Sequence, residues 1–148
     1  MDTVINEQAV RRQAAQDGIT HFATGIAIFR DGKLLVVRRV PEDTLGGVYE
    51  LPGGGVDEGE TITQGAIRET FEETGLTVHR VTGAFEGFDY QTSTKPKVRQ
   101  LNFKVEVEPG DVMLEPTEHD EYRWIFEDEV ADLGTTDVMK DCLYRAFQ

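Results

Sequence analysis

The most constraining feature of the sequence is a glycine-rich segment followed by a short acidic stretch with helical spacing. The segment spans residues 54–60, and Arg-Glu-Thr-Phe-Glu-Glu-Thr-Gly-Leu follows at residues 68–76. In a helix, Glu69, Glu72 and Glu73 occupy positions i, i+3 and i+4, so they share one face. Like charges at that spacing destabilise an isolated helix by about 0.2–0.5 kcal/mol per pair. Because the stretch contains a single basic residue, a divalent cation bound by carboxylate oxygens is the simplest compensation.

The same stretch predicts a helix from about Thr61 to Thr74. Gly75 follows at the position where a left-handed C-terminal cap belongs. At 100° per residue, apolar or small residues cover one side of the helix and the carboxylates cover an adjacent side. The predicted apolar side consists of Ile62, Ala66, Ile67, Thr70 and Phe71. One face is therefore expected to pack on a sheet while its neighbour faces a cleft.

Short extended segments and a second helix accompany this motif. Strands are predicted at residues 21–29, 33–39, 48–51, 76–88, 98–107 and 122–126, with a glycine loop at 53–59. A final helix is expected to start at Thr135 or Thr136, either of which can serve as N-cap. Its predicted apolar stripe is Val138, Met139, Cys142, Leu143 and Ala146. Because strands and helices alternate without a regular βαβ repeat, the order predicts an α/β fold with a mixed β-sheet and helices on its faces.

Composition narrows the classes of partner. A length of 148 residues with 39% hydrophobic residues suits one domain with a real core. The formal net charge of −13 argues against non-specific binding to nucleic acid or anionic membranes. No apolar run approaches about 18 residues, so no membrane span is predicted. The single cysteine, Cys142, suits a reducing compartment, and the N-terminal residues lack a signal-peptide pattern, so a cytoplasmic protein is expected.

The segment from Gly54 to Leu76, called the box below, resembles the Nudix box of the Nudix hydrolase family in its spacing. Its pattern is Gly, five residues, Glu, seven residues, Arg-Glu, two residues, Glu-Glu, one residue, Gly and an aliphatic residue. The matching positions are Gly54, Glu60, Arg68, Glu69, Glu72, Glu73, Gly75 and Leu76. Thr70 departs from the pattern, because the family usually has an aliphatic residue there, but its methyl group can still pack.

Features outside the box extend the resemblance to the MutT-like branch of the family. A hairpin ends in Arg38-Arg39, Leu-Pro-Gly-Gly follows at residues 51–54, and Glu118 stands six residues before Trp124. The resemblance implies a Nudix-type α/β/α sandwich over residues 19–148. Residues 1–18 are then a lead-in segment that the resemblance does not place.

The resemblance also implies the chemistry of the site. The family attacks a phosphorus atom of a diphosphate bridge with water, and Mg²⁺ is the expected ion, with Mn²⁺ as an alternative. The implied catalytic residues are Arg68, Glu69, Glu72, Glu73 and Glu118, and the implied metal ligands are the Gly53 carbonyl, Glu69, Glu72, Glu73 and Glu118. Glu69 is either a ligand or the general base, and Arg68 is expected to orient Glu72, one turn away. Glu118 either completes the metal site or acts as base.

Several neighbouring residues have two interpretations. Asp120 and Glu121 leave the assignment of Glu118 open. The implied substrate-binding residues are Arg38, Tyr90, Thr136 and Asp137. Arg38 either faces phosphate or is a plain surface charge. Tyr90 either stacks on a nucleobase or packs against the protein. Thr136 and Asp137 either contact a purine edge or cap a helix. The three histidines, His21, His79 and His119, lack metal-ligand spacing and are expected to be structural or exposed.

These observations predict a Mg²⁺-dependent Nudix pyrophosphohydrolase that cleaves the diphosphate linkage of a nucleoside triphosphate or related small nucleotide. Dinucleoside polyphosphates and nucleotide sugars are alternative substrates. A non-catalytic nucleotide-binding sensor is disfavoured, because sensors of that kind usually lose box carboxylates and this chain keeps them. The expected partner is a small-molecule nucleotide, with no nucleic acid and no membrane, and a homodimer is compatible with the family.

Overall fold

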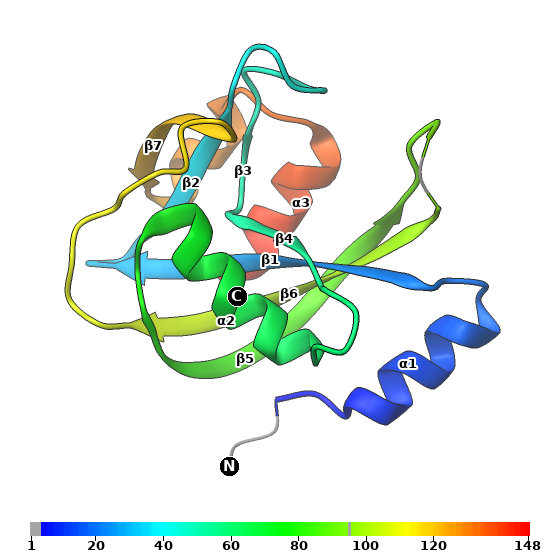
Figure 1. The fold of residues 1–148 in the computed structure, drawn as a ribbon. Coiled ribbons are helices and arrows are strands. Elements are labelled where there is room, and N and C mark those ends of the chain that lie inside the picture. Colours follow the sequence, from blue (N-terminus) through cyan, green and yellow to red (C-terminus); the bar gives the residue numbers. More distant parts are fainter. Residues whose placement is uncertain (1–3, 95) are drawn as a thin grey trace.

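A seven-stranded mixed sheet forms the centre of the structure (Figure 1). The computed structural model describes residues 4–94 and 96–148. The strands are β1 (His21–Arg30), β2 (Lys33–Arg39), β3 (Tyr49–Glu50), β4 (Gly53–Gly55), β5 (Val78–Tyr90), β6 (Val98–Val107) and β7 (His119–Ile125). The helices are α1 (Glu7–Gln16), α2 (Ile62–Thr74), the 3-10 helix η1 (Glu127–Asp132) and α3 (Asp137–Ala146). Within the described residues, no helix has the length and apolar character needed to cross a membrane.

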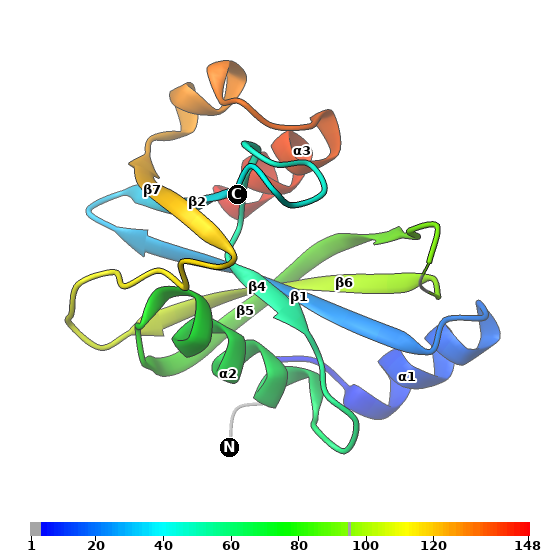
Figure 2. The same cartoon turned by 45° about the horizontal axis from the view of Figure 1, so that its top comes forward.

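Strand β1 is central, and its neighbours combine both pairing directions, which confirms the predicted mixed sheet. It pairs in parallel with β6 and antiparallel with β2 and β4. Strand β5 extends the sheet beyond β6, while β3 and β7 both pair with β2. Because β1 and β2 pair only at their hairpin end, β2, β3 and β7 form a wing that diverges from the other strands (Figure 2).

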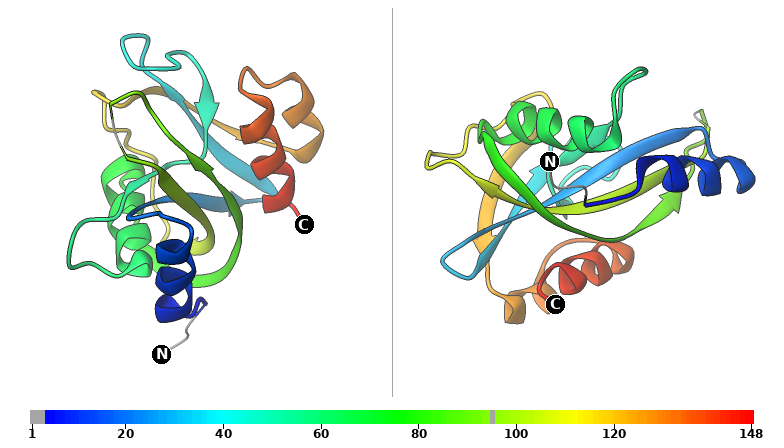
Figure 3. Two further views of the ribbon diagram at one scale, coloured as in Figure 1. Left: turned by 90° about the vertical axis from the view of Figure 1, so that its right-hand side faces the viewer. Right: turned by 90° about the horizontal axis from the view of Figure 1, so that it is seen from below.

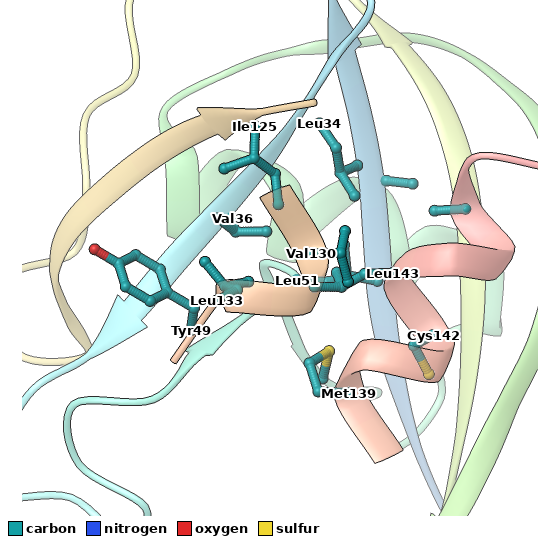
Figure 4. Close-up of a cluster of buried hydrophobic side chains, with 12 residues drawn as sticks. Leu34, Val36, Tyr49, Leu51, Ile125, Val130, Leu133, Met139, Cys142 and Leu143 are labelled. Carbon is teal, nitrogen blue, oxygen red and sulfur yellow. The ribbon is translucent and has the colours of Figure 1, made fainter. Parts of the chain in front are cut away.

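Helices α2 and α3 cover opposite faces of the sheet (Figure 3), and an apolar cluster lies beneath each of them. Figure 4 shows the cluster on the α3 face, which includes Leu34, Val36, Leu51, Ile125, Val130 and Leu143. The cluster on the α2 face includes Ile26, Ile28, Leu35, Ile62, Leu76 and Phe103. Because strand side chains alternate between faces, adjacent residues of β2 enter different clusters. The helices therefore cover both faces of one α/β sheet.

The predicted glycine loop is wrong in its first half, since Gly53–Gly55 is strand β4. It pairs with β1, with Gly25 opposite Gly53 and Ala23 opposite Gly55. A Cβ at Gly53 would lie 1.9 Å from the carbonyl oxygen of Thr24, so only glycine allows the two backbones this close. Glycine content is typical of a loop, and the pairing depends on a strand that lies far away in the sequence.

Other boundaries also differ from the prediction where pairing overrides local sequence. Strand β7 begins at His119 rather than Tyr122, because its polar first residues continue the ladder with β2, where His119 pairs with Arg39. Strand β5 continues to Tyr90 through its pairing with β6. Helix η1 was not predicted. Val138, placed on the apolar stripe of α3, is 52% exposed.

Helix α1 contacts the beginning of α2. The Glu7 carboxylate accepts a hydrogen bond from the backbone N–H of Ile62 at 3.1 Å, so it serves an N–H that α2 itself leaves unpaired. Arg11 donates to the carbonyl oxygen of Glu60 at 3.1 Å. Ala14 is fully buried in the cluster on the α2 face. Helix α1 thus shares the core of the following strands.

Candidate active site

Helix α2 begins and ends where the sequence predicts. The Thr61 side chain accepts from the N–H of Gln64 at 3.0 Å, and the Gln64 side chain accepts from the N–H of Thr61 at 2.9 Å. This capping box satisfies two of the free N–H groups at the start of the helix. At the other end, Gly75 has φ of 72° and donates to the carbonyl of Phe71 at 2.8 Å. The caps fix the register of the glutamates on the helix.

The face of α2 that packs on the sheet is only partly the predicted one. Ile67 and Phe71 are 41% and 58% exposed, so their assignment to the packed side was wrong. Glu69 and Glu73 are buried, with 9% and 8% of their surface exposed, and Thr70 between them in the sequence is fully buried. Buried carboxylates require charge partners, and the structure supplies two cationic side chains for them.

Arg68 is the first of these cations. Its guanidinium donates to both carboxylate oxygens of Glu60 at 2.8 and 2.9 Å, and to Gly55 O at 2.8 Å. It also donates to Glu69 at 2.9 Å and to Glu72 at 2.8 Å. The expected contact with Glu72 is therefore present. The planar fork of donors joins the glycine strand, the loop after it and the helix.

Burial and Arg68 move the pKa values of two box carboxylates in opposite directions. Hydrogen bonds from Arg68 lower the pKa of Glu60 to about 2, and the backbone N–H of Asp57 assists. Burial raises the pKa of Glu69, although Arg68 opposes the change. Glu60 thus stays ionised near neutral pH and ties Arg68 to the loop before α2. Glu69 accepts a proton more readily than an exposed glutamate does.

Strand β4 lies directly against Glu69. A Cβ built at Gly54 would stand 2.4 Å from the carboxyl carbon of Glu69, so any side chain there would displace the carboxylate. The hydroxyl of Thr24 donates to Gly54 O at 3.2 Å. Gly54, the first glycine of the box, therefore allows close approach of the helix carboxylate to the strand.

His119 is the second cation, and no site role is predicted for it from the sequence. Its side chain is 4% exposed, with Nε2 2.9 Å from Glu50 and Nδ1 3.0 Å from Glu73. Burial alone would lower the pKa of His119, but the two carboxylates outweigh burial and raise its pKa to about 9. The only sequence signal was its place directly after Glu118.

Arg38 and Glu118 lie near the same end of the β2–β7 ladder. Arg38 forms ion pairs with Asp120 at 2.8 Å and Glu121 at 3.3 Å. The Glu118 side chain is exposed, and its carbonyl accepts from the N–H of Val40 at 3.1 Å. The two acidic residues that competed with Glu118 are thus engaged by arginine. The predicted roles of Arg38 and Glu118 stay predictions.

The other predicted substrate residues lie on the α3 side. Tyr90 is 37% exposed and close to the Phe88 ring, with centroids 5.9 Å apart. Burial and the Glu50 charge raise the pKa of Tyr90. Thr136 caps α3 by accepting from the N–H of Met139 at 3.2 Å, and Asp137 is exposed in the first turn. Their contacts with a substrate stay predictions.

The donor atoms at this site fit a hard divalent cation. Across residues 4–94 and 96–148, no three acidic, histidine or cysteine side chains stand together as a preformed metal site. Glu69 and Glu72 are held by Arg68, and Glu73 faces His119. Glu73 Oε2 is nevertheless buried and lacks a hydrogen-bond partner among the described residues. Two observations support a divalent cation at this site: the unpartnered oxygen of Glu73, and the close approach of Gly54 to the Glu69 carboxylate, called the glycine cradle below.

Comparison with known proteins identifies the class. The family model of the NUDIX domain matches residues 19–146, so the chain belongs to the NUDIX domain family. An RNA pyrophosphohydrolase from Gluconobacter oxydans (strain 621H) is 34% identical over 137 residues, which cover 81% of this chain and 78% of the relative. The asymmetrical bis(5'-nucleosyl)-tetraphosphatase of Rattus norvegicus is 36% identical over 102 residues, covering 66% and 68%.

A solved structure refines the placement within the family. The MutT protein from Methanosarcina mazei Go1 has a TM-score of 0.75 and 27% identity, covering 85% of this chain and 91% of that chain. The predicted MutT-like branch and Nudix-type fold are confirmed. The protein is a Nudix hydrolase, an enzyme acting on pyrophosphate bonds in phosphorus-containing substrates.

Proposed function

We propose that the protein is a Mg²⁺-dependent pyrophosphohydrolase that cleaves the diphosphate linkage of a nucleoside triphosphate or a related small nucleotide. The observation that carries this proposal is the arrangement of Glu69, Glu72 and Glu73 on α2 beside the glycine strand. Two of these carboxylates are buried, which costs free energy that a purely structural helix would avoid. A cation bound by the carboxylates would offset that free-energy cost.

The proposed ligands are the Gly53 carbonyl, Glu69, Glu72 and Glu73, with Glu118 on the neighbouring loop. When bound, the cation would neutralise phosphate charge and lower the pKa of a bound water. Arg68 holds Glu69 and Glu72 in place through hydrogen bonds of 2.9 and 2.8 Å. Glu69, whose pKa burial raises, is one candidate for the general base, and Glu118 is the other.

The proposed substrate contacts are Arg38, Tyr90, Thr136 and Asp137. Arg38 would supply positive charge to phosphate in a chain whose net charge is −13. A dinucleoside polyphosphate is the second candidate substrate, supported by the similarity to the Rattus norvegicus enzyme and by the partly exposed ring of Tyr90. The RNA pyrophosphohydrolase relative adds an RNA to the test, although the net charge of −13 disfavours a long polyanion.

The test is a substrate panel with Mg²⁺, scored for pyrophosphate, phosphate and mononucleotide products. Glu72→Gln should lower kcat on the best substrate at least about 100-fold, the order of loss seen when one charge-stabilising group is removed. Glu58→Gln makes the same charge change at an exposed position of the box and should keep activity. Wild-type activity in the Glu72 variant would refute the site assignment.

The panel also tests the remaining alternatives. Tight nucleotide binding without product after prolonged incubation with Mg²⁺ would favour a non-catalytic sensor. A cytoplasmic location is proposed from the single, buried and unpaired Cys142. A homodimer stays a prediction, and light scattering coupled to gel filtration measures it.

A further inference from the structure

His119 joins three elements that are far apart in the sequence. Its ring lies between Glu50 of β3 and Glu73 of α2, at N···O distances of 2.9 and 3.0 Å. The histidine itself opens β7 and is almost fully buried. It therefore links the β2–β3–β7 wing to the catalytic helix through side chains alone.

The side of the ring that faces Glu50 is firmly anchored. Glu50 uses its Oε2 for His119 Nε2 and its Oε1 for the guanidinium of Arg39, 3.1 Å away. Arg39 in turn donates to Asp43 at 2.8 Å. Because both oxygens of Glu50 are engaged, the carboxylate and the imidazole are restricted to one orientation.

The side of the His119 ring that faces α2 is less firmly held, because its neighbour Glu73 forms no hydrogen bond with it. In the described part of the chain, Arg68 pairs with Asp57, Glu60, Glu69 and Glu72 but not with Glu73. Glu73 Oε2 is 3.0 Å from His119 Nδ1, yet the angles do not meet those of a hydrogen bond. His119 Nδ1 therefore stands beside Glu73 without a formed hydrogen bond, and a lone pair of Glu73 is not committed to a donor.

We propose that His119 is a positioning residue that holds Glu73 in the orientation in which it binds the metal, with Glu50 as the fixed support. This inference rests on the proposed function in one respect, the assignment of Glu73 as a ligand. Partners behind metal-binding carboxylates orient them, and replacing such a partner typically lowers metal affinity by about 10- to 100-fold. The same logic applies here because the buried His119 ring places Nδ1 3.0 Å from Glu73 Oε2 and is fixed on its other side by Glu50.

Two amide variants separate positioning from simple loss of charge. Asn in place of His119 puts an amide near Nδ1 and keeps a donor toward Glu73, whereas Gln reaches the position of Nε2 and keeps the donor toward Glu50. Mn²⁺ binding to the metal-free proteins, measured by electron paramagnetic resonance, is the readout. His119→Gln should weaken Mn²⁺ binding about 10-fold, and His119→Asn should fall between it and wild type.

The controls are His79→Gln and His79→Asn. His79 lies on β5, is 61% exposed and pairs with Glu108 at 3.0 Å rather than with a carboxylate of the box, so these changes should leave Mn²⁺ affinity unaltered. Circular dichroism and thermal unfolding check that each variant is folded. Equal losses in the Asn and Gln variants, or none in either, would overturn the proposal.

A measurement on wild-type protein needs no variant to fold. The ¹⁵N resonance of His119 Nδ1 should shift when Mg²⁺ is added, while that of His79 should stay constant, and an unmoved His119 resonance contradicts the inference. The outcome is separable from the proposed function. Mn²⁺ binding that depends on His119 in a protein without hydrolytic activity would support the positioning role and refute the pyrophosphohydrolase.

Discussion

Two cationic side chains allow the box carboxylates to be buried. Arg68 neutralises Glu60, Glu69 and Glu72 by direct hydrogen bonds, and His119 faces Glu73. Removing either cation would leave a buried carboxylate without compensation, which costs more than the pair contributes when intact. The site therefore depends on each of these two side chains individually.

The close approach of Gly54 to Glu69 predicts a sharp contrast between adjacent glycines. Gly54→Ala should lower kcat about 100-fold, because the new Cβ would displace the Glu69 carboxylate by roughly an ångström. Gly55→Ala is the control, since a Cβ there meets no atom within 4 Å. Steady-state kinetics on both variants decides the matter, and equal activities would exclude the cradle.

Glu60 predicts a pH dependence of stability. Its ordinary pKa is 4.5 and its pKa in the folded protein is about 2, so folding favours the ionised form. Its contribution is complete above about pH 4.5 and is lost as the pH falls toward about 2. Urea unfolding of metal-free protein should show that Glu60→Gln costs about 1–3 kcal/mol near neutral pH and progressively less below about pH 4.5. A difference that is constant with pH would contradict this.

At the scale of elements, the ends of α2 and its buried face have different origins. The capping box at Thr61 and the left-handed Gly75 are local features, so they follow from neighbouring residues. The buried face follows instead from what packs against it. Glu69 and Glu73 turn inward because Arg68 and His119 receive them, and Phe71 is left at the surface.

Two isoleucines of α2 test this assignment. Ile62→Ala should lower the free energy of unfolding by about 2–5 kcal/mol, because Ile62 is fully buried against the sheet. Ile67→Ala makes the identical change at a 41% exposed position and should cost clearly less. Urea denaturation measures both. Similar losses would restore the predicted apolar side.

At the scale of the molecule, segments outside the box hold it in place. Helix α1 precedes the region that matches the family model, yet Glu7 and Arg11 contact the start of α2 and the loop before it. On the other side, the β2–β3–β7 wing contributes Glu50 and His119. The site is thus supported from both ends of the sheet.

Two adjacent arginines of α1, Arg11 and Arg12, provide a test of whether this helix supports the box. Arg11→Ala should lower the free energy of unfolding by about 1 kcal/mol, because Arg11 donates to Glu60 O and its guanidinium lies 5.1 Å from the Phe22 ring centroid. Arg12→Ala removes the same charge at an exposed position and should be nearly neutral. Thermal and urea unfolding compare the two. Equal effects would argue against a role for α1 in supporting the box.

Much of the fold was predictable because its signals are local. The order of the main strands, the bounds of α2 and its C-terminal cap at Gly75 appear in short stretches of sequence. The strand at Gly53–Gly55 was missed because glycines carry no pattern of side chains, and only the partner strand shows that they pair. The polar start of β7 was missed for the same reason.

The sequence by itself determined the identity and spacing of the box carboxylates, and with them the family and the type of bond attacked. Spacing along one helix is set by the backbone, so it needs no tertiary contact. Only the tertiary structure decided which carboxylates are buried and which cation faces each of them. Glu50, Glu73 and His119 come from three separate segments, and their contact exists only once the sheet and α2 have packed together.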